Sequence, residues 1–133
     1  MSLQGARGLF SAEWGGPYPG ISRRNGPPRF SHLVVQAGEV ATMLPFEIPT
    51  QAVEELDLSR KRKRALLLGR PRWNETSGTL LLAPPYPGGG INGDHLVYLW
   101  RQDGAAYTLS LHAWLPLRES TATLRAVVES IRG

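Results

Sequence analysis

The chain contains no cysteine among its 133 residues. This absence excludes disulfide bridges, thiol catalysis, iron–sulfur clusters and zinc sites built on cysteine. The sequence also lacks any apolar run near the roughly 18 residues that a membrane-spanning helix requires. Hydrophobic residues make up 41% and charged residues 20% of the chain, and together with four tryptophans they indicate one folded domain with its own core.

The formal net charge is +4 and the pI is about 10.0. Both values are typical of proteins that bind anionic partners such as nucleic acid. Arginine heavily outnumbers lysine, which is also typical of GC-rich bacterial genomes. Five cations are contiguous and form a basic run: Arg60, Lys61, Arg62, Lys63 and Arg64. The run has three interpretations, namely a phosphate-binding site for nucleic acid, a patch for anionic lipid, and a solvated loop. We favour the solvated loop, because no aromatic residues interleave with these cations to stack on bases.

The chain divides by composition at about residue 30. Residues 1–29 are rich in glycine and proline and predict an extended arm, whereas residues 30–133 predict a single domain. The first residues do not follow the basic-then-apolar pattern of a signal peptide. This start leaves the location open, with an extracytoplasmic location expected if the chain was trimmed from a longer protein and a cytoplasmic one otherwise.

Short apolar runs predict an antiparallel sheet. Strands are expected near residues 30–36 and 39–44 as a hairpin, and again at residues 65–69 and 79–83. Between the hairpin and the strand at residues 65–69, a short helix is expected, with Thr50 as its N-cap and its end near residue 58.

The strongest local signals lie in the last forty residues. Asp103-Gly104 between two β-rich runs predicts a hairpin of strands 95–100 and 107–114. After it, Leu124, Val127, Val128 and Ile131 recur at helical spacing. A helix over residues 120–131 is therefore expected, with Ser120 as its N-cap and Gly133 just beyond its end.

A two-residue turn at Asp103-Gly104 fixes which residues face each other. His95 then lies opposite His112, close enough for the two imidazoles to share a metal ion or a proton. A three-residue turn would instead place Asp94 opposite His112. Zinc or another divalent metal at His95 and His112 would need a third ligand, for which His32 or a distant carboxylate remains. The alternative is that both histidines are half-buried strand residues with ordinary hydrogen bonds.

The stretch PPYPGGGINGD, residues 84–94, contains Gly88, Gly90 and Gly93 in the spacing G-x-G-x-x-G. A strand follows it instead of a helix, so the dipole arrangement of a dinucleotide site is missing and we reject that function. The simplest interpretation is a proline turn with a flexible glycine loop. A partner could nevertheless approach its backbone closely, which makes Tyr86, Gly89 and Gly90 candidate ligand-binding residues.

The segment LVYLWRQDGAAYTLSLHAWLPLRESTATLRAVVESI resembles the closing unit of extracytoplasmic bacterial domains of the PsbP-like and lipoprotein type. The resemblance rests mainly on Tyr107, Trp114 and Val128-x-Ser130-Ile131, and it covers less than a third of the chain. It implies an antiparallel sheet with helices packed on it and a non-catalytic accessory or assembly role. The Pro-rich first third departs from the pattern, and the resemblance carries over no functional residue.

Together these features predict an α+β fold, with an antiparallel sheet of five or six strands and a C-terminal helix on one face. The favoured function is a non-enzymatic binding or assembly domain, with an unidentified protein or small ligand as partner and a homodimer as one form of assembly. Its ligand surface is expected at the glycine loop and the exposed face around His95, His112 and Trp114. The alternatives are a histidine- or metal-dependent enzyme that uses His95 and His112, and nucleic-acid or anionic-surface binding through residues 60–64.

Overall fold

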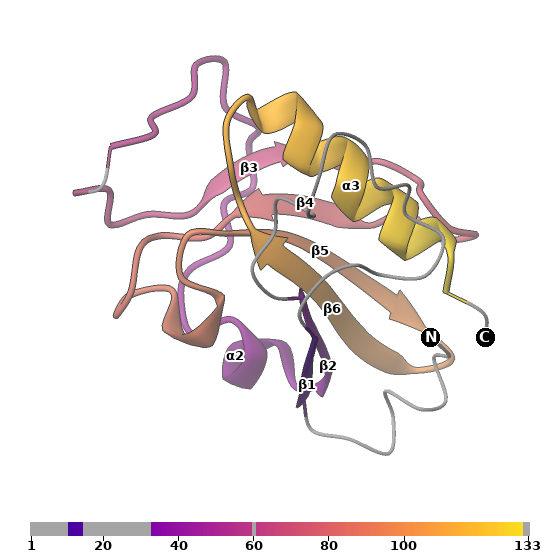
Figure 1. Ribbon diagram of the computed structural model, residues 1–133. Coiled ribbons are helices and arrows are strands. Elements are labelled where there is room, and N and C mark those ends of the chain that lie inside the picture. Colours follow the sequence, from indigo (N-terminus) through magenta and orange to yellow (C-terminus); the bar gives the residue numbers. More distant parts are fainter. Residues whose placement is uncertain (1–10, 15–32, 60, 132–133) are drawn as a thin grey trace.

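The structure of the protein is a computed structural model that describes residues 11–14, 33–59 and 61–131. Its strands form one six-stranded antiparallel sheet in the order β1-β2-β6-β5-β4-β3 (Figure 1). The strands are β1 (Ser11–Trp14), β2 (Leu33–Gly38), β3 (Leu66–Gly69), β4 (Thr79–Leu82), β5 (His95–Gln102) and β6 (Ala105–His112). The helices are α2 (Val40–Met43), the 3₁₀ turn η1 (Gly90–Asn92) and α3 (Leu117–Glu129). The predicted α+β class is confirmed.

The hairpin of β5 and β6 lies at the centre of the sheet. Asp103 and Gly104 form its turn with φ values of 52° and 76°, and a two-residue hairpin turn needs this left-handed conformation at both positions. The register pairs His95 with His112, Val97 with Ser110 and Trp100 with Tyr107, as the two-residue turn predicts.

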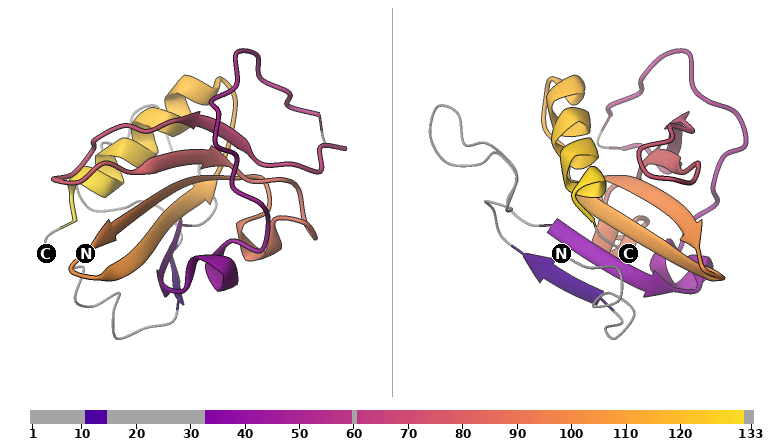
Figure 2. Two further views of the ribbon diagram at one scale, coloured as in Figure 1. Left: turned by 180° about the vertical axis from the view of Figure 1, so that it is seen from behind. Right: turned by 90° about the vertical axis from the view of Figure 1, so that its right-hand side faces the viewer.

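One face of this hairpin carries the larger core. Leu96, Tyr98, Trp100, Tyr107, Leu109 and Leu111 pack there with Leu124, Val127 and Val128 of α3. The helix lies along this face in every view (Figures 1 and 2). Burial raises the pKa of the Tyr98 phenol, against an opposing hydrogen bond from the Trp73 amide, so the phenol stays protonated and donates to the Pro71 carbonyl.

The opposite face of the sheet carries a second, smaller core. Its buried members include Leu67, Leu81, Val97 and Leu99 from the strands, together with Met43 of α2. α2 therefore covers the face that α3 leaves open (Figure 2). Because residues alternate between faces along each strand, the side chains of His95, Thr108 and Ser110 share this second face.

The predicted hairpin of residues 30–36 and 39–44 is wrong. β2 pairs with β6 on one side and with β1 on the other, so no edge of β2 remains for residues 39–44. Gly38, with φ 152°, ends the strand, and the chain turns into α2. Met43 and Leu44 are then buried against the sheet face instead of extending the sheet.

The predicted helix over residues 50–58 is also wrong. This segment is irregular, and its one regular feature is a parallel bridge between Ala52 and Leu67 at the outer edge of β3. Residues 54–58 are exposed. A short helix without a buried face has too little packing to repay the cost of ordering it.

The C-terminal helix exists, and Leu124, Val127 and Val128 form its buried stripe as predicted. It begins earlier than expected, at Leu117, with Pro116 in the N-cap position. The prediction of Ser120 as the cap is therefore wrong. The Ser120 hydroxyl is buried inside the helix and lies 3.1 Å from the carbonyl oxygens of both Trp114 and Leu117. Gly133 lies outside the described residues.

The predicted N-terminal arm contributes an edge strand to the sheet. Residues 11–14 form β1, which pairs antiparallel with β2, and the rest of residues 1–29 lies outside the described residues. Within the part of the chain that the structure describes, no helix has both the length and the apolar character that crossing a bilayer requires.

Candidate functional site

The two histidines of the central hairpin face each other as predicted. Their rings are edge to face, with centroids 5.6 Å apart and planes at 89°. Their environments differ, because His112 is exposed whereas only 1% of His95 is accessible. The expectation of an exposed face around His95 is therefore wrong.

His95 is buried because it belongs to a polar network on the face covered by α2. The network consists of five buried side chains: Gln36, Asn92, His95, Thr108 and Ser110. β2, β5 and β6 each supply at least one of them, and η1 delivers Asn92 from the glycine loop. Polar side chains are buried at low cost only when they satisfy one another, so these five act as one structural unit.

The hydrogen bonds of this network run in one direction. The Asn92 amide nitrogen lies 3.0 Å from both Gln36 Oε1 and the Met43 carbonyl, so it donates to both. Asn92 Oδ1 then accepts the Ser110 hydroxyl proton at 2.6 Å. With its single proton committed, Ser110 can only accept at His95 Nδ1, 2.9 Å away.

The direction of these hydrogen bonds determines which nitrogen of His95 is protonated and where the Ser110 hydroxyl points. His95 carries a proton on Nδ1 in either protonation state, so the basic nitrogen of its neutral form is Nε2. The Ser110 hydroxyl is directed at an amide oxygen and not at a base, which is the opposite of what an activated serine nucleophile requires. His95 and Ser110 are therefore placed as members of the core.

Metal binding at the histidine pair stays a prediction. Among the described residues, no group of three or more histidine or carboxylate side chains is close enough to hold a metal ion. His32, the third ligand that the sequence suggested, lies outside those residues. His95 and His112 are the two ligands that the register brings together.

The glycine loop, residues 84–94, is packed against itself. Backbone amides of Gly89, Gly90, Asn92 and Gly93 each donate to a carbonyl within the loop, so they are not free to cradle an anion. Gly89 is buried, and a side chain there would overlap the Pro84 carbonyl. The glycines permit this close packing, which is what presents Asn92 to the network.

Tyr86 and Trp114, which were also predicted to bind a ligand, lie at the same end of the sheet but on different surfaces. The Ala113 amide donates to the Asp94 carbonyl, which holds the glycine loop beside the end of β6. Tyr86 is 78% exposed on that loop. Trp114 is half-buried against the core beneath α3, on the face opposite to His95.

The basic run divides into two kinds of residue. Arg62 is turned inward, with only 5% of its side chain accessible, and its guanidinium donates to the Ala83 carbonyl and lies 3.5 Å from the Asp94 carboxylate. Lys61, Lys63 and Arg64 are exposed, and Arg60 lies outside the described residues. One of the five predicted anion-binding residues is thus a buried tie to the glycine loop.

Replacing Arg62 by methionine, which keeps the aliphatic stem, is expected to lower the free energy of unfolding by about 2 kcal/mol. The buried Ala83 carbonyl would lose its charged donor, whereas Asp94, with 43% of its side chain accessible, can turn to water. Urea unfolding measures the change, and Lys63→Met is the control because Lys63 is exposed. Equal losses for the two variants would contradict the inward role of Arg62.

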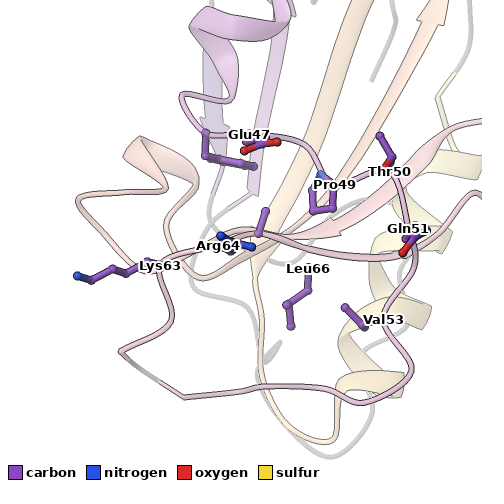
Figure 3. Close-up of a pocket in the computed structure, with 10 residues that line it drawn as sticks. Glu47, Pro49, Thr50, Gln51, Val53, Lys63, Arg64 and Leu66 are labelled. Carbon is purple, nitrogen blue, oxygen red and sulfur yellow. The ribbon is translucent and has the colours of Figure 1, made fainter.

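A cleft of about 510 Å³ lies between the irregular segment 46–53 and residues 63–66 at the start of β3 (Figure 3). Phe46, Pro49, Val53 and Leu66 provide its apolar lining. Lys63 and Arg64 add two cations on one wall, and Glu47 adds one carboxylate on the other. The Arg70 guanidinium donates to the Thr50 carbonyl and holds the outer wall to the body of the domain.

The sequence pattern gave no indication of this cleft, because residues 50–58, which include part of its outer wall, fit a short helix. The available signal was Pro45 and Pro49, which lack amide donors and favour an irregular path between two structured elements. The pairing of Val53 with Leu67, at 2.9 Å between amide and carbonyl, had no signal in the local pattern.

Comparisons with known proteins do not indicate a function for this site. No protein-family model, curated protein or solved structure matches the chain at a significant level. The function must therefore be argued from the contacts, exposure and charge of the site itself.

Proposed function

We propose that this protein is a non-enzymatic binding domain that holds an acidic, partly apolar peptide segment in the cleft between residues 46–53 and 63–66. The observation that carries the proposal is the state of Lys63 and Arg64. Both are exposed on the cleft wall, and neither forms an ion pair within the described residues. Unpaired cations beside an apolar lining suit a ligand that carries both carboxylates and aliphatic side chains.

The dimensions of the cleft support a ligand of this kind. Its volume of about 510 Å³ falls in the range of roughly 300–1,000 Å³ that is typical of pockets for small molecules and side chains. Phe46, Pro49 and Val53 would contact aliphatic groups, while Lys63 and Arg64 would contact carboxylates.

The same features favour a peptide over nucleic acid. A phosphate backbone is held by a row of accessible cations, but Arg62 is turned into the protein and divides the run. The apolar lining gives a phosphate chain nothing to contact. A peptide with alternating acidic and aliphatic residues can use both parts of the surface.

A fluorescein-labelled peptide of alternating glutamate and leucine tests the proposal by fluorescence anisotropy. Combined Lys63→Ala and Arg64→Ala is expected to weaken its binding at least about tenfold, because each unpaired cation contributes to attraction of the carboxylates. The matched control combines Arg101→Ala and Arg118→Ala, which remove two exposed cations outside the cleft.

Added salt should weaken binding of the peptide, since the charges are solvent-exposed. Equal affinity in the cleft variant and the control variant would overturn the proposal. Tighter binding of duplex DNA than of the peptide, lost in the same cleft variant, would replace it with the nucleic-acid function.

A further inference from the structure

The segment between the two walls of the cleft has the composition that the cleft is suited to bind. Residues 54–58, which we call the acidic segment, read Glu54-Glu55-Leu56-Asp57-Leu58. Leu56 is 48% and Leu58 is 41% exposed, and they are two of the four large hydrophobic side chains exposed among the described residues. The loop that carries them projects beyond the edge of the sheet (Figure 1).

Both ends of the acidic segment are anchored to the body of the domain. At one end, the Val53 amide donates to the Leu67 carbonyl at 2.9 Å. At the other end, Arg62 is tied to the Ala83 carbonyl and to Asp94. Between these anchors the Asp57 carboxylate accepts the Ser59 amide at 2.9 Å, which turns the chain.

Among the described residues, the charges of the acidic segment and of the cleft wall have no ion-pair partner. Glu54 and Glu55 form no ion pair within the described residues, and neither do Lys63 and Arg64. The single copy therefore displays acids and exposed leucines beside a cleft with cations and an apolar lining. This charge complementarity favours a partner that carries the same acidic segment.

We propose that the partner is a second copy of this chain, whose acidic segment occupies the cleft while its own cleft receives the first copy's segment. The inference rests on the proposed function and names its ligand. Val53 lines the cleft and Glu54 begins the acidic segment, so the two surfaces are adjacent. Adjacent complementary surfaces can pair twice across a two-fold axis, which closes a symmetric dimer.

The contact is small, so we expect the dimer to be weak and concentration-dependent. Sedimentation equilibrium across a concentration series measures it for the whole chain. The synthetic peptide VEELDLS, residues 53–59, should bind the cleft and compete with dimer formation.

Charge reversal gives the sharpest test. The cleft variant combines Lys63→Glu with Arg64→Glu, and the segment variant combines Glu54→Lys with Glu55→Lys. Each variant alone places like charges at both contacts, so its self-association should fall about a hundredfold. An equimolar mixture places opposite charges at both contacts and should restore a dimer of one copy of each.

Circular dichroism checks that both variants are folded, and the exposure of all four residues predicts that they are. Dimers that persist in either variant, or a mixture that does not associate, would overturn the inference. If the wild-type protein is monomeric at every concentration but still binds the glutamate–leucine peptide, the inference fails and the proposed function stands. If the monomer binds neither peptide, both fail.

Discussion

Replacing Asn92 by alanine is expected to lower the free energy of unfolding by about 4 kcal/mol, because each of three buried groups loses a partner and each loss costs about 1–3 kcal/mol. The Gln36 side-chain oxygen and the Met43 carbonyl lose a donor. The Ser110 hydroxyl loses its acceptor. Asn92 is fully buried, so water cannot replace these contacts without opening the glycine loop.

Chemical denaturation measures the loss, with Asn74→Ala as the matched control. Asn74 accepts from Thr76 within its own half-buried turn, where water can reach the freed groups more easily, so the control should change stability less. Asn92→Asp should be at least as harmful as alanine, because a carboxylate oxygen would then face two acceptors. A loss for Asn92→Ala no larger than for Asn74→Ala would show that the network does not hold the loop.

The centre of the sheet could be predicted from sequence because its determinants are local. Asp103 and Gly104 fit a turn that needs two left-handed residues. That turn alone fixes the alternation that buries Tyr98 and Trp100 and opposes His95 to His112. The buried stripe of α3 was equally local, since three of its residues recur at helical spacing.

The remaining elements depended on pairings between distant parts of the chain. The apolar pattern of residues 39–44 fits a strand, yet β2 already has partners on both edges, so the segment forms α2. The segment 50–58 begins with residues that are typical of a helix N-terminus, but it has no apolar face that could pack against the sheet. Their path follows a bridge to Leu67, fifteen positions beyond Ala52.

In the candidate site, too, local contacts could be predicted from the sequence and long-range contacts could not. The register placed His95 beside Ser110 and opposite His112, but no local pattern indicated that Gln36 and Asn92 would complete a buried network. Arg62 was one cation among five in the sequence. Its inward direction follows from the Ala83 carbonyl and Asp94, which belong to a loop more than twenty residues away.

The glycine loop was predicted to be flexible, whereas its packing requires particular glycines. A methyl group at Gly89 would overlap the Pro84 carbonyl and lie 2.7 Å from Gly93 Cα. Both neighbours are backbone, so neither can turn aside as a flexible side chain would. The loop must therefore move as a unit to accept any side chain at this position.

Gly89→Ala is expected to lower the free energy of unfolding by about 3 kcal/mol, at the upper end of the cost of overpacking a closed site. Gly88→Ala is the matched control, because its nearest contact would be the Pro85 carbonyl at 3.5 Å, an ordinary distance. The control adds the same methyl group one residue away, on an exposed position.

The two variants also separate packing from ligand binding at the loop. Thermal and urea unfolding should distinguish them clearly, with Gly88→Ala close to the wild-type protein. If the glycines serve packing, Gly89→Ala also releases Asn92 from the network, and its loss should not add fully to that of Asn92→Ala in the double variant. Fully additive losses, or equal stability of Gly88→Ala and Gly89→Ala, would show that the close approach of Gly89 to Pro84 does not position Asn92.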